Sequence, residues 1–104
     1  MTAEERSILA SLPAEVIEHE RIDSEAAELS FESCDALLIV SAKVSEDVVG
    51  QLRRCRVVSR YGSGTDNVNV AAATRDGIVV TNVPDFCLSD VAEHTLALLL
   101  GVAR

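Results

Sequence analysis

The sequence predicts an α/β fold, in which a parallel sheet is flanked by helices. Short aliphatic runs alternate with helical patterns along the 104 residues, a length that suits one domain. Apolar residues make up 48% of the chain but aromatic residues only 3%, so its core must be built from Val, Leu, Ile and Ala. Such a core suits helices packed on aliphatic strands. Strands separated by helices form right-handed crossover units and therefore a parallel sheet.

The first part of the chain predicts a helix, a strand and a second helix. Thr2 and Glu5 have the spacing of a capping box, and Pro13 ends the helix that they begin. Residues 14–19 predict a short half-buried strand, and Ser24 can cap the next helix. The apolar positions of these two helices are Ile8, Leu9, Leu12, Ala27, Leu29 and Phe31.

Three further strands are predicted at residues 36–40 (ALLIV), 55–59 (CRVVS) and 78–81 (IVVT). The continuous apolar run of the first predicts a strand that is covered on both faces. Between the strands, Ser45 can cap a helix that continues to Leu52. The next helix begins after Asn69, continues to Thr74 and is closed by Gly77.

The last predicted helix is apolar on nearly every side. Ser89 can cap it, and Asp90 and Glu93 in its first turn interact favourably with the helix dipole. Residues 91–103 (VAEHTLALLLGVA) leave almost no polar face. Such a helix is expected to be buried against another part of a protein.

Composition argues against several classes of function. The formal net charge is −8 and the basic residues form no coherent face, so nucleic acid is not an expected partner. No apolar run is long enough for a membrane span, and residues 1–6 are polar with no secretory segment after them. The number of cysteines is odd and their spacing is not that of a metal site; they are Cys34, Cys55 and Cys87. We expect no metal, and three reduced thiols in a cytoplasmic protein.

The most informative segment is the glycine-rich loop in residues 57–67 (VVSRYGSGTDN). It follows a predicted strand, and ligands of open parallel sheets bind beyond the carboxyl ends of the strands. Gly62 and Gly64 permit backbone conformations and close approaches that a Cβ would forbid. Their N–H groups can surround a carboxylate or phosphate, and Arg60 adds a positive charge at the rim.

One other interpretation of this loop is rejected, and two remain open. It is a near match to the dinucleotide-binding fingerprint, with Asp85 at a suitable distance, but Asn67 replaces the third glycine. The next helix also begins only at Asn69, too late for its N-terminus to contact a pyrophosphate. A purely structural tight turn, and a solvated strand-end role for Arg60, remain open.

Residues 59–104 (SRYGSGTDNVNVAAATRDGIVVTNVPDFCLSDVAEHTLALLLGVAR) resemble the D-isomer-specific 2-hydroxyacid dehydrogenases, the family of phosphoglycerate dehydrogenase and D-lactate dehydrogenase. The loop, the AAT…GI run and VAEHTLALLL follow the family pattern in order. NVPDFC is similar to the branch that includes the C-terminal-binding-protein co-repressors. The resemblance implies a flavodoxin-like sheet that lacks its first, central strand, which would precede Thr2.

The resemblance also implies a division of the chain. Residues 1–88 would be an incomplete substrate-binding (catalytic) domain, and residues 89–104 the start of an interdomain helix. That helix would lead to an NAD-binding domain beyond Arg104, where the family also carries its catalytic His, Glu and Arg. The chain alone is therefore expected to be inactive, as the N-terminal part of a full-length cytoplasmic homodimer.

Several site residues follow from the same resemblance. The backbone of Tyr61, Gly62, Ser63 and Gly64 would receive the substrate carboxylate, and Arg60 would border this site. Ser63 would also stand close to the cofactor.

Other residues of the family motif have lesser implied roles. Thr95 would lie near the nicotinamide, while Asp66 and Asn67 would hold the loop by local hydrogen bonds. Glu93 and His94 are neighbours on a helix and point in different directions, so they are not an acid/base pair.

These observations favour a fragment of an oxidoreductase that transfers a hydride between NAD(H) and a small 2-hydroxy or 2-oxo acid. Two alternatives remain open. One is a non-catalytic, NAD-sensing protein similar to the co-repressors, and the other is a stand-alone anion-binding flavodoxin-like module.

Overall fold

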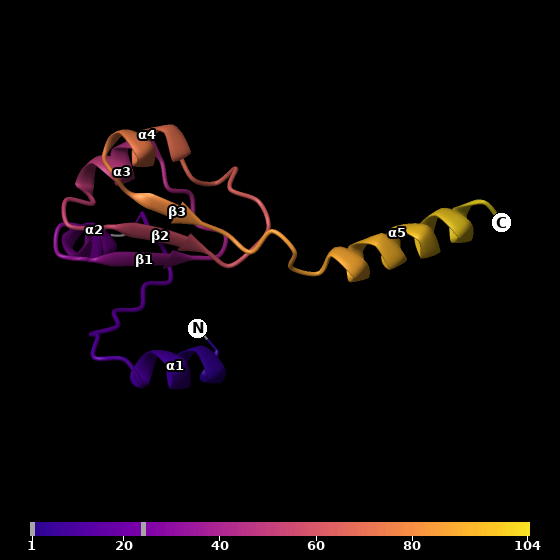
Figure 1. Ribbon diagram of the computed structural model, residues 1–104, viewed down its shortest axis with the longest axis horizontal. Coiled ribbons are helices and arrows are strands. Elements are labelled where there is room, and N and C mark those ends of the chain that lie inside the picture. The colour runs from indigo at the N-terminus through magenta and orange to yellow at the C-terminus, as the bar shows by residue number, and fades with distance from the viewer. Residues whose placement is uncertain (1, 24) are drawn as a thin grey trace.

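The computed structural model describes residues 2–23 and 25–104. Its three strands are parallel and lie side by side in the order β1-β2-β3 (Figure 1). This arrangement confirms the predicted α/β class with a parallel sheet. The helices and strands, in chain order, are α1 (Ala3–Ala10), α2 (Glu25–Phe31), β1 (Ala36–Ile39), α3 (Glu46–Gln51), β2 (Val57–Arg60), α4 (Val70–Arg75), β3 (Val79–Thr81) and α5 (Leu88–Val102).

The local signals predicted at the starts of α1, α3 and α4 and at the end of α4 are confirmed. Thr2 and Glu5 form both hydrogen bonds of a capping box at the start of α1. The side chains of Ser45 and Asn69 accept backbone N–H groups at the starts of α3 and α4. Gly77 follows α4 with a φ of 73°. This is the left-handed conformation, which glycine adopts more easily than other residues because it has no Cβ.

Two predicted elements are wrong. Ser89 lies inside α5, which begins at Leu88 after Cys87, and Cys87 makes no side-chain capping bond. Residues 14–19 form no strand, because no neighbouring segment offers them a ladder of hydrogen bonds. An extended segment, unlike a helix, cannot satisfy its own backbone. The predicted cap at residue 24 lies outside the described residues.

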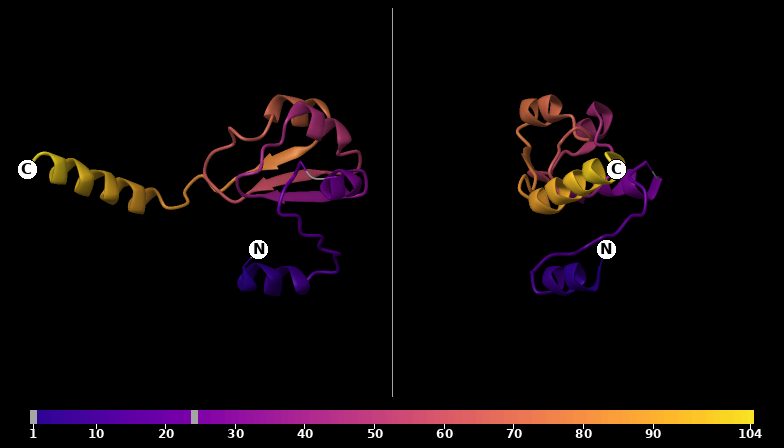
Figure 2. Two further views of the ribbon diagram at one scale, coloured as in Figure 1. Left: turned by 180° about the vertical axis from the view of Figure 1, so that it is seen from behind. Right: turned by 90° about the vertical axis from the view of Figure 1, so that its right-hand side faces the viewer.

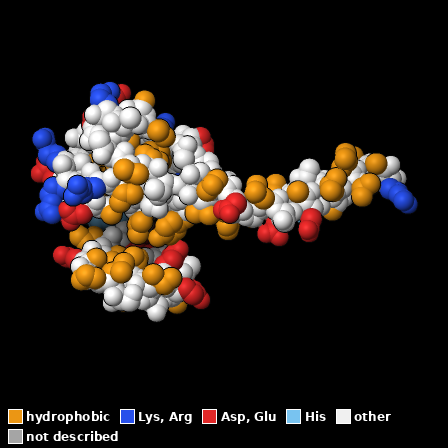
Figure 3. All heavy atoms as spheres, viewed as in Figure 1, with side chains coloured by type: hydrophobic (Ala, Val, Ile, Leu, Met, Phe, Trp, Pro, Cys, Tyr) orange, Lys and Arg blue, Asp and Glu red, His pale blue; other side chains and the backbone are white. Residues whose placement is uncertain are grey.

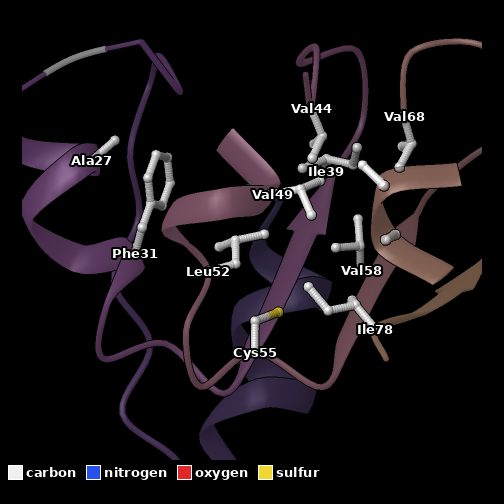
Figure 4. Close-up of a cluster of buried hydrophobic side chains, with 12 residues drawn as sticks. Ala27, Phe31, Ile39, Val44, Val49, Leu52, Cys55, Val58, Val68 and Ile78 are labelled. Carbon is white, nitrogen blue, oxygen red and sulfur yellow. The ribbon is translucent and has the colours of Figure 1, made fainter. Parts of the chain in front are cut away.

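The hydrophobic core occupies one face of the sheet. The strand register places Leu37, Val58 and Val80 side by side on this face. Helices α3 and α4 cover it, and α2 packs against α3 at the β1 edge (Figures 2 and 4). The opposite face is bare, with Leu38 44% and Val79 59% exposed. The expectation that residues 36–40 are covered on both faces is therefore wrong for the described chain.

The helices at the two ends of the chain stand apart from the sheet. Neither α1 nor α5 contacts another described helix or strand, and α5 projects from the sheet as a separate rod (Figures 1 and 2). Apolar side chains lie along it (Figure 3), with Leu99 63% and Val102 88% exposed. The radius of gyration is 16.9 Å, whereas a compact chain of this length has about 13 Å. Within residues 2–23 and 25–104, no helix is long and apolar enough to cross a membrane.

Candidate functional site

The glycine-rich loop lies at the carboxyl edge of the sheet, where β2 ends at Arg60 (Figure 1). The segment after β1 runs beside it and is joined to it by a parallel bridge between Val44 and Val68. Val44 N donates to Asn67 O at 2.8 Å, and Asn69 N donates to Val44 O at 2.9 Å. These bonds fix the far end of the loop, so residues 61–66 form a short arch between two anchored ends.

Arg60 folds back across this arch. Its side chain is half-buried, with Nε donating to Val40 O at 3.1 Å and Nη1 donating to Gly64 O at 3.0 Å. The guanidinium therefore ties the end of β1 to the middle of the loop. This geometry differs from a freely solvated strand-end charge, and it places a permanent positive charge beside the backbone of residues 62–64.

The glycines of the loop allow this close approach. A Cβ placed on Gly62 would lie 2.5 Å from Arg60 Nη1, and one on Gly64 would lie 2.8 Å from Asp66 Oδ1. Neither glycine has a positive φ; among the described glycines only Gly77 does. The expectation of special backbone conformations at Gly62 and Gly64 is therefore wrong, whereas the expectation of close approach is confirmed.

The four amides expected to receive a carboxylate divide into two pairs. Tyr61 N donates to Ile39 O at 2.9 Å and Gly62 N donates to Arg60 O at 3.0 Å, so both are already used. The N–H groups of Ser63 and Gly64 have no acceptor among the described residues. Ser63 is exposed and Gly64 half-buried, so two adjacent amide donors remain available to a ligand.

A second tether of the loop was not predicted from the sequence. Asn82 Nδ2 donates to Ser63 O at 2.6 Å, and Val83 N donates to Gly62 O at 3.0 Å. Both bonds use carbonyls of the loop, so they leave the N–H groups of Ser63 and Gly64 unused. A polar residue directly after β3, at the same edge of the sheet, is the signal that could have indicated Asn82.

Asp66 and Asn67 have different surroundings. Asn67 Nδ2 donates to Ala42 O at 2.8 Å, a bond to a distant segment rather than the expected local one. Its Oδ1 is buried without a partner among the described residues. Asn67 thus links the loops after β1 and β2, while Asp66 is exposed.

The structure does not bring Thr95 to the loop. Thr95 is exposed on α5, and its hydroxyl donates to Val91 O of the same helix at 2.7 Å. His94 and Glu93 are exposed on the same rod. The chain nevertheless leaves the sheet for α5 at the edge that carries the loop (Figure 1).

Two shallow hollows lie away from the loop. One, of about 580 Å³, is bordered by α2 and α3 and includes Phe31, Lys43 and Ser45. The other, of about 300 Å³, lies beside α1 and includes Leu9 and Val16. Neither includes a residue between Arg60 and Gly64.

An open parallel sheet with a glycine-rich loop at its carboxyl edge is typical of α/β domains whose ligands bind beyond the strand ends. Comparison with known proteins makes this class specific. The chain matches the catalytic domain of the D-isomer specific 2-hydroxyacid dehydrogenases over residues 1–98. It therefore belongs to this family, as the resemblance of its motifs predicts.

The chain is similar to D-3-phosphoglycerate dehydrogenase of Sus scrofa, with 37% identity over 100 residues, which cover 95% of this chain and 19% of that protein. It thus spans about a fifth of the length of this relative.

Two solved structures share its fold. D-lactate dehydrogenase from Aquifex aeolicus, complexed with NAD and lactic acid, has a TM-score of 0.80 at 20% identity and covers 93% of this chain and 29% of its own. NAD+-bound 3-phosphoglycerate dehydrogenase of Entamoeba histolytica has a TM-score of 0.75 at 25% identity, and the match covers 90% of this chain and 32% of that one. The flavodoxin-like class of the sheet is consistent with both, and both were solved with the nicotinamide cofactor.

Proposed function

We propose that this chain is the substrate-binding part of an NAD-dependent oxidoreductase that transfers a hydride between NAD(H) and a small 2-hydroxy or 2-oxo acid. The observation that carries the proposal is the pair of unused N–H groups at Ser63 and Gly64 beside the Arg60 guanidinium. Two adjacent donors next to a fixed positive charge suit a carboxylate, which such acids carry at neutral pH. Family membership supplies the class of reaction.

The residues of the loop would have distinct tasks. The amides of Ser63 and Gly64 would donate to the substrate carboxylate and so fix the orientation of its reactive carbon. Arg60 would lower the free energy of the bound anion through its charge while holding the arch in shape. Tyr61 and Gly62 would support the loop through their internal bonds rather than bind the substrate directly.

NAD, when bound by a domain beyond Arg104, would supply or accept the hydride. Ser63 on the loop and Thr95 on α5, both exposed, would have a supporting role toward it. Residues 1–88 would be the substrate-binding part, and residues 89–104 would begin the helix between domains. In the full-length protein, which we expect to be a cytoplasmic homodimer, the apolar surface of α5 would be covered.

The carboxylate-binding step can be tested by nuclear magnetic resonance. Pyruvate is titrated into the isotopically labelled chain while the backbone amides are followed, with pyruvamide as an uncharged control of the same shape. We expect the signals of Ser63 and Gly64 to shift with pyruvate, and those of Tyr61 and Gly62 to shift much less. Equal shifts with pyruvamide, or unmoved Ser63 and Gly64 signals at saturating pyruvate, would contradict the role of the loop.

The hydride-transfer step needs a separate test. The chain alone should not oxidise NADH in the presence of pyruvate, glyoxylate or hydroxypyruvate, whereas the full-length protein should use at least one of them. Turnover by the chain alone would overturn the proposed division of the site. Binding of NAD by the full-length protein without turnover of any 2-oxo acid would favour the co-repressor-like alternative.

A further inference from the structure

The opposite, amino-terminal edge of the sheet holds two cysteines that the proposed function does not use. Cys34 precedes β1 and Cys55 precedes β2. The parallel register pairs Ala36 with Val57, and the ladder continues one step further back because Arg56 N donates to Asp35 O at 2.9 Å. One position further back, the two segments that lead into β1 and β2 place Cys34 opposite Cys55.

This placement suits a disulfide. Neighbouring strands lie about 4.8 Å apart, and disulfides join residues whose Cα atoms are roughly 4.4–6.8 Å apart. Both cysteines lie just outside the strands, and both side chains lie against the same hydrophobic core. Cys55 belongs to the buried core, and Cys34 packs against that core from its edge (Figure 4 shows Cys55).

The segments around the two cysteines are held in place by other bonds. Arg54 Nη2 contacts Asp35 Oδ1 at 2.9 Å, which joins the residues next to each cysteine. Cys34 N donates to Ser30 O at the end of α2, and Cys55 Sγ donates to Val57 O at 3.2 Å. The two backbone segments are thus held beside each other, with Cys34 and Cys55 at corresponding positions.

We propose that Cys34 and Cys55 form an oxidisable pair, in which an intramolecular disulfide joins the start of β1 to the start of β2. The oxidant is a low-molecular-weight disulfide of the glutathione type. Cys87 takes no part, because it lies at the start of α5, beyond the other end of the strands (Figure 1).

The reaction proceeds by two thiol–disulfide exchanges. Cys34, the half-exposed thiol, loses its proton and attacks one sulfur of the oxidant, and one reduced thiol leaves. Cys55 then loses its proton and attacks the Cys34 sulfur of this mixed disulfide, which releases the second reduced thiol. The two cysteines are oxidised to a disulfide, the oxidant is reduced to two thiols, and the two protons end on the released thiols.

Oxidation of the Cys34–Cys55 pair is slow at neutral pH. Burial, with a further contribution from the adjacent Cys55, raises the pKa of the Cys34 thiol to about 11. Because only the thiolate attacks, the first exchange accelerates as the pH rises. The pair therefore stays reduced under mild conditions and responds to sustained oxidation, which is consistent with thiols that are normally reduced.

The test is incubation of the folded, full chain with oxidised glutathione at mildly alkaline pH, followed by alkylation and peptide mapping. We expect a protein that has lost two hydrogen masses, a peptide that links Cys34 to Cys55, and alkylation of Cys87 alone. The Cys87→Ser variant should behave in the same way, and the Cys34→Ser variant should give no internal cross-link. Urea unfolding should show that the cross-link lowers the unfolding equilibrium constant on the order of 100-fold.

Three results would overturn the proposal. They are a glutathione adduct that persists on Cys34 without a cross-link, a cross-link that includes Cys87, and oxidation that leaves Cys34 and Cys55 both free. The Cys34→Ser variant changes a half-exposed residue rather than the buried Cys55, so its folding can be checked independently by circular dichroism.

Discussion

Substitution of Gly62 by alanine tests the packing of Arg60 over the loop. The new Cβ would lie 2.5 Å from Arg60 Nη1 and 2.8 Å from its Cζ, which is closer than real Cβ contacts allow. The guanidinium would have to move by roughly an ångström to restore normal van der Waals contact. Its hydrogen bonds to Val40 O and Gly64 O would then be lost or weakened.

The magnitude follows from these two bonds. Each hydrogen bond from a charged group contributes about 1.5–3 kcal/mol. Because Arg60 is partly exposed, its two bonds each lie at the low end of this range. Because the φ of Gly62 is not left-handed, alanine would also stabilise by about 0.4–1 kcal/mol through the unfolded chain. We expect Gly62→Ala to lower the free energy of unfolding by about 1–2 kcal/mol.

Gly50→Ala provides the matched control. A Cβ on Gly50 would meet no atom within 4 Å, and Gly50 lies in helix α3. Alanine there should therefore stabilise the protein by up to about 1 kcal/mol. Urea unfolding of the full chain measures both variants. A stabilising Gly62→Ala, or an unchanged cost when Arg60→Ala is also present, would refute the packing of Arg60 over Gly62.

Three further predictions concern other parts of the chain. Asn82→Ala should remove the bond to Ser63 O, weaken pyruvate binding at the Ser63 amide several-fold and lower the free energy of unfolding in urea by about 1 kcal/mol. Pyruvate-induced shifts of the Ser63 amide that equal those of the unaltered chain would show that this bond does not position the loop. Alkylation of Cys34 should rise with pH to a midpoint near 11, and a midpoint at the ordinary thiol value would contradict its burial. The backbone amide hydrogens of α5 (Leu88–Val102) should exchange with solvent far faster than that of Val58, because an uncovered helix of this length is marginally stable in water. Equal protection of α5 and Val58 from exchange would show that α5 is covered.

The sequence predicted best those features that depend on near neighbours. The capping box at Thr2 and the side-chain caps at Ser45 and Asn69 each need residues no more than three positions away. Gly77 is similar, because a glycine that follows a helical pattern is a local signal of a left-handed helix end. The strands after residue 35 were predicted because their short aliphatic runs alternate with helical patterns that have their own caps.

The failures depend on partners that are distant in sequence. Residues 14–19 have the pattern of a strand, but a strand exists only where a neighbour offers its backbone, and none of the described residues does so. The expected coverage of both faces of residues 36–40 failed because no described helix packs on the face that carries Leu38.

The same limit applies to the candidate site. The motif identified the loop, but the bonds that shape it come from Val40, Ala42 and Asn82, which are far from it in sequence. Which amides remain free therefore could not be read from the motif. Only the folded chain distinguishes Tyr61 and Gly62 from Ser63 and Gly64.

β2 connects the two edges of the sheet that we assign to different chemistry, with Cys55 just before it and Arg60 at its end. The extended rise places these two positions roughly 16 Å apart. A disulfide at the amino edge fixes a register that already exists, so it should not move the Ser63 and Gly64 amides. We therefore predict that the oxidised and reduced chains bind pyruvate with equal affinity in the same titration. A several-fold difference between them would mean that the register of β1 and β2 changes on oxidation, and the strand pairing at Ala36 and Val57 would then have to differ from the one described.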